Sequence, residues 1–235
     1  MRALLCFFFC LLIGTRASSQ VLISILFGEK LNTGQLEFGL VISPSFCSVT
    51  NTGSSYKSAL GLGIYFNWKL SDRWYFHPEG TAKGAFGGKK ITPYPTGDKV
   101  IDSLYAGGNI SRNFTALSLP LLIRYRIAGL FFAEAGPQAD LMISKKDVFM
   151  AKADGNDITY TRNVKDDYTL LDLAWATGLE YRFKEKASMA VSVRYLYGLT
   201  NIAKTGPGNQ HNSVWSINVF IPIGAGKSTK NEKHP

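Results

Sequence analysis

The chain has 235 residues, a length that suits a single β-domain of the barrel type. Its formal net charge is +9, and loss of Arg2 and Arg16 with an export signal leaves +7. The basic residues are scattered along the chain except for a small cluster in the C-terminal tail, so the charge does not indicate a nucleic-acid-binding surface. We expect no nucleic acid among the partners.

Residues 1–19 have the features of a cleavable export signal. Arg2 precedes the apolar run Ala3–Gly14, and Ala17-Ser18-Ser19 supplies the small residues that a signal peptidase reads, with Gln20 as the new first residue. The apolar run is about a dozen residues long, whereas a membrane-spanning helix needs about twenty. Cleavage leaves Cys47 as the single cysteine, which excludes an intramolecular disulfide and predicts a buried, small apolar side chain.

The mature chain carries eight segments in which apolar and polar residues alternate with the period of two that is typical of β-strands. Before them lies segment 20–33, an N-terminal periplasmic segment whose apolar run is interpretable either as a strand or as a stretch at the membrane surface. The eight expected strands are Gly34–Phe46, Ser58–Leu70, Arg73–Phe86, the two strands of the hairpin Thr115–Leu141 joined at Ala128-Gly129, Tyr168–Phe183, Ala187–Thr200 and Val214–Ile223.

The connections between these strands alternate between long and short. Two of the long loops are Gly87–Phe114 and Ser144–Asp167, whereas Ser71-Asp72 is a tight turn. Barrels of the bacterial outer membrane have an even number of strands, short periplasmic turns and longer outer loops. The pattern therefore predicts an all-β fold, an eight-stranded antiparallel up-and-down transmembrane β-barrel over residues 34–224, followed by a basic tail at 225–235.

Aromatic residues gather near the expected strand ends, as in the girdles that flank the apolar band of a membrane barrel. The expected inner girdle consists of Trp68, Trp74, Tyr125, Phe131, Tyr181 and Phe183. The expected outer girdle consists of Phe86, Phe114, Tyr168, Tyr197 and Trp215.

Charged residues share the strand face opposite the apolar one. An eight-stranded barrel is only wide enough for side chains to fill it, so opposite charges on this face are expected to pair across the lumen and close it. We predict a structural lumen charge network made of Glu37, Glu79, Arg124, Arg126, Glu134, Asp172, Glu180, Arg182 and Arg194.

Several segments resemble the PorT-type outer-membrane β-barrel family of Bacteroidota, a porin-like family. These segments are LISILFGEKLNTGQLEFGL, LSDRWYFHPEG, LSLPLLIRYRI followed by FFAEAGPQADL, and GLEYRF with VRYLYGLTNI. The resemblance implies an outer-membrane barrel with no cofactor and no catalytic motif, and some members are linked to protein secretion. Glu79, Pro120 and Gly136-Pro137 match positions of the family pattern and are interpreted as structural. The basic tail departs from the strand-terminal aromatic on which many barrels end.

Three functions remain open at this point. The first is a non-enzymatic outer-membrane barrel with a structural or protein-interaction role, contacting outer-membrane lipid and, through loops or periplasmic ends, envelope or secretion proteins. The second is a passive channel for small solutes. The third, a lipid-modifying enzyme, would need a nucleophile and an oriented base, and only His77 and His211 lie within the expected barrel. We therefore expect no catalytic, cofactor-binding or metal-binding residues. A soluble ligand-binding barrel with its apolar face inward is the structural rival.

Overall fold

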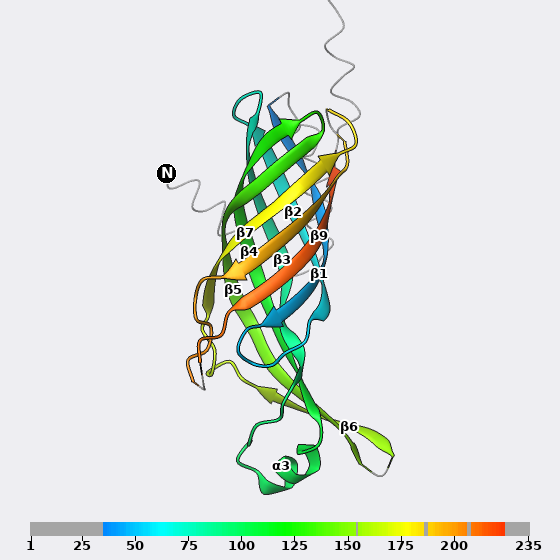
Figure 1. The fold of residues 1–235 in the computed structure, drawn as a ribbon, viewed down its shortest axis with the longest axis vertical. Helices are drawn as coiled ribbons and strands as arrows, with labels where there is room; N and C mark the ends of the chain where they lie inside the picture. Colours follow the sequence, from blue (N-terminus) through cyan, green and yellow to red (C-terminus); the bar gives the residue numbers. More distant parts are fainter. Residues whose placement is uncertain (1–34, 154, 186–187, 206–207, 224–235) are drawn as a thin grey trace, which may run out of the picture.

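Eight antiparallel strands close into a tilted barrel, and a ninth short strand is attached outside it (Figure 1). The computed structural model describes residues 35–153, 155–185, 188–205 and 208–223. The expected segments 1–19, 20–33 and 225–235 lie outside the described residues. The strands are β1 (Leu36–Val49), β2 (Lys57–Lys69), β3 (Trp74–Ile91), β4 (Asn109–Ala128), β5 (Phe131–Ala153), β6 (Asn156–Asn163), β7 (Leu171–Arg182), β8 (Ala190–Gly198) and β9 (Asn212–Pro222).

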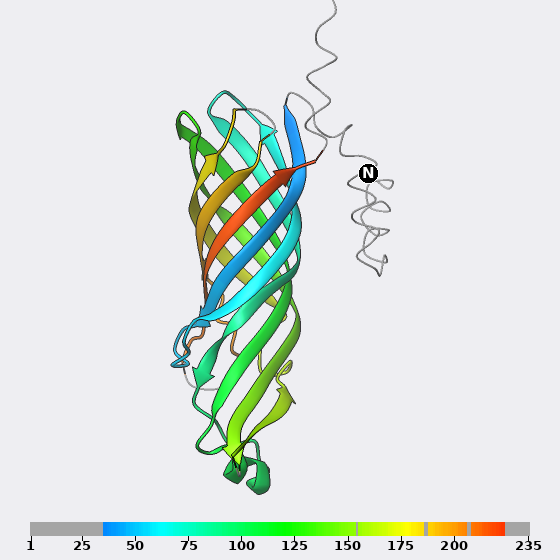
Figure 2. The same cartoon turned by 90° about the vertical axis from the view of Figure 1, so that its right-hand side faces the viewer.

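The ring closes because the first and last strands pair with each other and because β5 pairs past β6 with β7. β1 pairs with β9, β5 pairs with β7, and the hairpin pairing of β4 with β5 completes the circle. One end of the barrel, here called the turn end, carries the three short connections β2–β3, β4–β5 and β7–β8. The other, the loop end, carries the β1–β2 connection, which is as long as β7–β8, and the longer connections β3–β4, β5–β7 and β8–β9 (Figure 2). The eight-stranded antiparallel ring predicted from the sequence is therefore confirmed.

The apolar face of the strands points outward, away from the lumen. Large apolar side chains such as Leu62, Trp175, Leu179 and Val193 are about half exposed, whereas polar residues fill the interior. A soluble barrel would place these groups in the opposite way, so the soluble ligand-binding alternative is wrong. Among the described residues, no helix has the length and apolar character of a membrane span.

Two expected loops are in fact regular structure. β4 and β5 have 20 and 23 residues, roughly twice the ten or so that a membrane-spanning strand requires. Within Gly87–Phe114 the structure has the end of β3, the helix α3 (Lys99–Tyr105) and the start of β4. Within Ser144–Asp167 it has the end of β5 and the hairpin to β6. Outside lipid the outward face no longer needs to be apolar, so the alternation that marks a membrane strand disappears although the strand continues.

Smaller corrections concern the strand ends. The central turn is Gly129-Leu130, because Ala128 is already paired with Phe131, and Gly129 has the positive φ of 51° that the turn requires. Gly136 approaches the backbone of β4 so closely that a Cβ would lie 2.2 Å from the carbonyl oxygen of Leu121. Its structural interpretation therefore has a direct steric basis.

Candidate functional site

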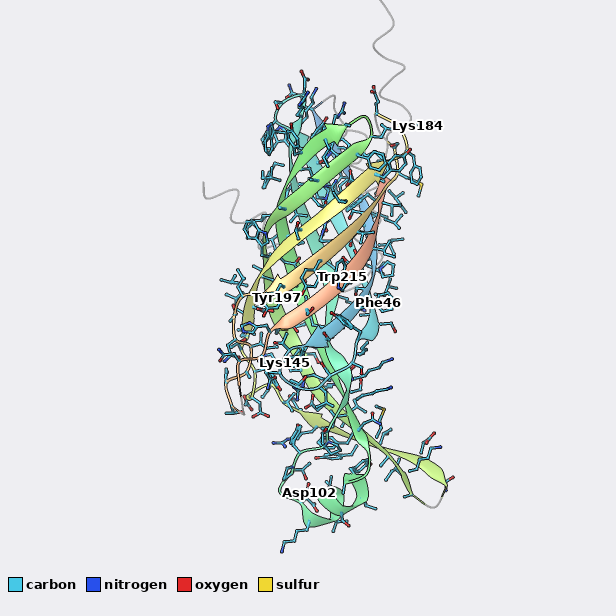
Figure 3. All side chains as sticks on the ribbon, in the orientation of Figure 1. Phe46, Asp102, Lys145, Lys184, Tyr197 and Trp215 are labelled. Carbon is cyan, nitrogen blue, oxygen red and sulfur yellow. The ribbon has the colours of Figure 1, made fainter. Side chains whose placement is uncertain are left out.

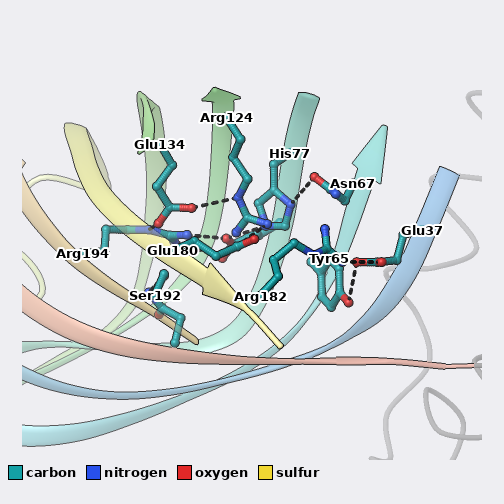
Figure 4. Close-up of polar contacts among 12 residues, drawn as sticks. Glu37, Tyr65, Asn67, His77, Arg124, Glu134, Glu180, Arg182, Ser192 and Arg194 are labelled. Carbon is teal, nitrogen blue, oxygen red and sulfur yellow. Dashed lines mark hydrogen bonds and ion pairs between the residues drawn. The ribbon is translucent and has the colours of Figure 1, made fainter. Parts of the chain in front are cut away.

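The lumen at the turn end is filled by a buried network of ion pairs (Figure 4). Glu134 lies at its centre: its Oε2 is 2.9 Å from Arg124 Nε, and its Oε1 is 2.8 Å from Arg194 Nε. The two guanidinium groups extend the network in opposite directions, since Arg124 Nη1 lies 2.6 Å from Glu180 Oε2 and Arg194 Nη2 lies 2.6 Å from Glu79 Oε1. All five side chains are at most 5% exposed, so the charges are compensated by one another and not by bulk water.

Two further groups continue the network toward β1 and β2. Arg182 forms an ion pair with Glu37, which also accepts a hydrogen bond of 3.1 Å from the hydroxyl of Tyr65. The ring of His77 bridges Glu79 and Asn67. Nε2 of the ring lies 3.0 Å from Glu79 Oε1, and Nδ1 lies 3.3 Å from Asn67 Oδ1. His77 is thus a fully buried member of the charge network.

Seven of the nine predicted network residues are joined in this way, and two are not. Arg126 donates to the hydroxyl of Tyr75 at 3.2 Å and lies 5.4 Å from the centre of the Phe132 ring, and it forms no ion pair with a carboxylate of the described residues. Asp172 is fully buried, and its partner is an amide and not a guanidinium: Asn212 Nδ2 donates a hydrogen bond of 2.8 Å to Asp172 Oδ2. The expected ion pairing is wrong for both. Arg126 is at the turn end, where its guanidinium lies over the ring of Phe132. Asp172 lies on the loop side of Arg124 and Arg194.

An apolar cluster closes the lumen on the loop side of the ion pairs. Its members include Phe114, Met142, Tyr168 and Leu196, together with Cys47, which is fully buried as predicted. The polar layer toward the turn end leaves a cavity of only about 70 Å³, bordered by Glu79, Arg194 and their neighbours. The described part of the lumen therefore consists of a charged layer followed by an apolar layer.

This apolar cluster corrects the predicted outer girdle. Phe86, Phe114 and Tyr168 point inward and are only 4%, 2% and 6% exposed, while Tyr197 and Trp215 lie on the outer face at 39% and 47% (Figure 3). The predicted inner girdle agrees better with the structure. Five of its six residues are exposed at the turn end, namely Trp68, Trp74, Phe131, Tyr181 and Phe183. The alternation of β4 places Phe114 on the same face as Arg124, a signal that was present in the sequence.

Beyond the loop end, the strands continue into a projecting unit that we call the extension, residues 87–113 and 145–163 (Figure 1). It has a core of its own, made of Ile91, Tyr105, Ile110 and Phe149. The rings of Tyr94, Tyr105 and Tyr160 surround Phe149 with centroid distances of 5.3 to 6.0 Å. A folded unit is thus present where the sequence suggested only loops.

The segment that carries α3 is held by two aspartates. Asp98 caps the helix by accepting from the backbone N–H groups of Val100 and Ile101. Asp102 accepts from both the N–H and the hydroxyl of Thr96, each at 2.7 Å, and these donors lower the pKa of its carboxyl. Figure 3 shows Asp102 at the far tip of the extension, at the opposite end of the molecule from Lys184.

A buried ion pair joins the two segments of the extension where they leave the barrel. The guanidinium of Arg112 contacts both carboxylate oxygens of Asp147, with Nε–Oδ1 at 2.8 Å and Nη2–Oδ2 at 2.7 Å. Arg112 also donates to Gln210 of the β8–β9 loop at 3.3 Å and lies 4.7 Å from the ring centre of Tyr168. This pair was not predicted from the sequence, because both residues fell in expected loops. The Asp154-Gly155 dipeptide, typical of a two-residue hairpin turn, was the available signal.

The described residues contain no group of three or more His, Cys, Asp or Glu side chains that could hold a metal ion. His211 does not approach His77; its ring stacks on Tyr197 at 5.7 Å.

Comparison with curated proteins gave no match. Among solved structures, the chain resembles Ail, the attachment invasion locus protein of Yersinia pestis, at 12% identity, with 82% of this chain and all of that one covered and a TM-score of 0.41. It also resembles OprG of Pseudomonas aeruginosa at 13% identity, covering 80% and 91% of the two chains with a TM-score of 0.35. The model of the family described as an outer membrane protein beta-barrel domain matches residues 31–204. The chain therefore belongs to this family, and its location is the outer membrane.

Proposed function

We propose that this protein is a non-enzymatic outer-membrane barrel that presents the extension at the cell surface to bind a protein partner. In an outer-membrane barrel the short turns face the periplasm and the longer connections face outward, so the extension lies outside the cell. The observation that carries the proposal is the apolar tip of the extension: Val100 and Leu104 of α3 are 68% and 49% exposed.

The construction of the extension supports a binding role. Its aromatic core and the Arg112–Asp147 pair hold α3 in a fixed position relative to the barrel. Val100 and Leu104 are four residues apart and lie on one face of the helix, which is the spacing of a helix that docks on an apolar partner surface. A rigid presentation lowers the ordering cost of binding.

The passive-channel alternative has less support. The ion pairs and the apolar cluster fill successive layers of the lumen, and the cavity between them is only about 70 Å³. Swelling of proteoliposomes in solutions of small sugars measures whether the barrel conducts solutes. We expect uptake at the rate of empty liposomes.

The resemblance to PorT-type proteins of Bacteroidota refines the proposal: the partner would belong to protein secretion across the outer membrane, and the chain would be exported by the signal at residues 1–19. The enzymatic alternative is not favoured, since the ring nitrogens of His77 are engaged by Glu79 and Asn67. Mass spectrometry of the mature protein tests the predicted N-terminus at Gln20.

Photo-cross-linking on intact cells tests the binding role. A benzophenone side chain at Val100 is expected to give a discrete protein adduct, and the same group at Asp72 in a periplasmic turn is expected to give none of that mass. Leu104→Asp should abolish the adduct, whereas the matched control Ser103→Asp on the same exposed helix should retain it. Absence of an adduct at Val100, or its persistence in Leu104→Asp, would overturn the proposal.

A further inference from the structure

A groove with a volume of about 570 Å³ crosses the outer face of the barrel, over β4, β5, β7 and β8. Its floor consists of small side chains: Ala135 of β5 is the register partner of Thr177 of β7, and Ala133 lies two positions away on the same face of β5. Ile123 on β4 and Val193 on β8 border this floor on its two sides. The difference in side-chain size therefore leaves a hollow in the apolar outer surface.

A pair of aromatic rings stands on each side of the groove. The rings of Trp74 and Tyr125, on β3 and β4, have centroids 4.7 Å apart, and those of Tyr195 and Trp215, on β8 and β9, have centroids 4.8 Å apart. Trp74 begins β3 at the turn end. Figure 3 shows Trp215 farther along the barrel from Lys184, which marks that end. The groove thus runs obliquely from the turn end into the apolar band.

The turn end of the groove carries a cation. Arg73 Nη1 donates a hydrogen bond of 3.1 Å to the hydroxyl of Tyr125, which lines the groove. The Arg73 side chain is exposed, and no ion pair among the described residues includes it. The neighbouring carboxylate of Asp72 lies 2.8 Å from Lys69 instead. A guanidinium group suits a phosphate in both charge and hydrogen-bond geometry.

We propose that this groove binds one anionic phospholipid, with its phosphate at Arg73 and one acyl chain between the two aromatic pairs. Trp and Tyr rings collect at the headgroup level of a membrane, so Trp74 and Tyr125 place Arg73 at the depth of the lipid phosphates. Beyond Tyr125 the side chains that line the groove are largely apolar. The groove therefore has the polarity order of a lipid, a charged group at the membrane surface followed by hydrocarbon.

A second copy of the chain fits this surface less well than a lipid does. A twofold dimer would place the same patch of both copies in contact, so one hollow would face the other and the contact would enclose a void. A flexible acyl chain can follow an oblique groove and fill it.

Native mass spectrometry of the full chain, refolded in detergent and titrated with dioleoylphosphatidylglycerol, tests the acyl-chain site. One lipid per chain should stay bound under collisional activation that removes the detergent. Ala135→Trp fills the floor of the groove and should lower this retention about tenfold. The matched control Ala139→Trp, on the same face of β5 but outside the groove, should behave like the parent. Heat-dependent mobility on a gel verifies that each variant is folded.

Replacing Arg73 by glutamine tests the phosphate contact. Arg73→Gln should weaken phosphatidylglycerol retention about fivefold, whereas dioleoylglycerol, which lacks the phosphate, should bind parent and variant equally. Lys184→Gln, at another cation of the turn end, should have no effect. An adduct with glycerol phosphate at the same concentration would assign Arg73 to a free phosphate and overturn the proposal.

Two outcomes of the floor variants would also overturn it. Equal lipid retention in Ala135→Trp and Ala139→Trp would show that lipid does not occupy the groove. A parent that is dimeric and becomes monomeric in Ala135→Trp would show that a second copy fills it.

Discussion

Replacing Glu134 by glutamine probes whether the lumen is dry. The side chain is 2% exposed and contacts Arg124 on one side and Arg194 on the other, at 2.9 and 2.8 Å. Glutamine keeps the shape of the side chain and removes its charge. Both arginines would remain in place with one carboxylate fewer between them.

The size of the effect depends on water access. Removing one partner of a buried ion pair costs about 3–5 kcal/mol, whereas an exposed pair contributes only about 0–1 kcal/mol. Arg124 keeps Glu180 and Arg194 keeps Glu79 in the variant, so we expect the lower end of the buried range, about 3 kcal/mol of unfolding free energy.

Guanidinium-induced unfolding of the protein refolded in phospholipid vesicles measures this loss. Tryptophan fluorescence reports on the transition, since Trp68, Trp74 and Trp215 are all exposed on the outer face. The control is Glu185→Gln in an exposed turn, which should change the free energy by less than about 0.5 kcal/mol. A loss below about 1 kcal/mol for Glu134→Gln would refute the reasoning, because only a hydrated lumen screens the pair that strongly.

Three further predictions concern the apolar layer and the extension. Phe114→Ala should lower the unfolding free energy by about 3–5 kcal/mol in the same assay, since it empties a site in the apolar cluster; a value near zero would mean that the cluster is loosely packed. Arg112→Met leaves the buried Asp147 without its cation, although the hydroxyl of Tyr94 still donates to it, so limited trypsin digestion should cut the extension many times faster while the barrel keeps its heat-dependent mobility on a gel; equal digestion would contradict the coupling. The pKa of Asp102 is lowered from 3.8 by the donors on Thr96, so its contribution to the order of the α3 segment is complete above pH 3.8 and is lost as the pH falls through the lower folded value. The hydrogen-exchange protection factors of residues 96–105, corrected for the intrinsic rate at each pH, should therefore fall on acidification in the parent and not in Asp102→Asn.

The barrel was predictable because one physical rule acts on every membrane-spanning residue. Lipid requires apolar side chains at alternate positions, so the pattern around Leu119, Leu121 and Ile123 identifies both the strand and its outward face. The same alternation correctly places Arg124 and Glu134 in the lumen. Which acid meets which arginine was not predictable, because the distance across the lumen depends on strand tilt and register, and a single strand pattern fixes neither.

The extension was missed because the rule stops at the membrane surface. Beyond it both strand faces meet water or protein, so Ser111, Asn113 and Lys145 can occupy regular strand positions without an apolar alternation. The register of β3 with β4 shifts between Gly88 and Ile91, and the strand continues beyond this irregularity. The backbone there has positive φ at Gly87 and Lys90. Composition alone therefore predicts a loop for such a segment.

The arrangement of layers supports the proposed role in binding outside the membrane over transport through the barrel. At about 3.3 Å per residue the 23 residues of β5 run for roughly 75 Å, so one continuous strand passes from the short turn at Phe131, through the charged layer at Glu134, to the extension at Phe149. Each layer of the lumen adds cross-strand contacts to that strand, and the Arg112–Asp147 pair fixes it where it leaves the barrel. A partner that docks on α3 therefore contacts a support anchored through the whole thickness of the membrane, and the filled lumen is what makes this support stiff.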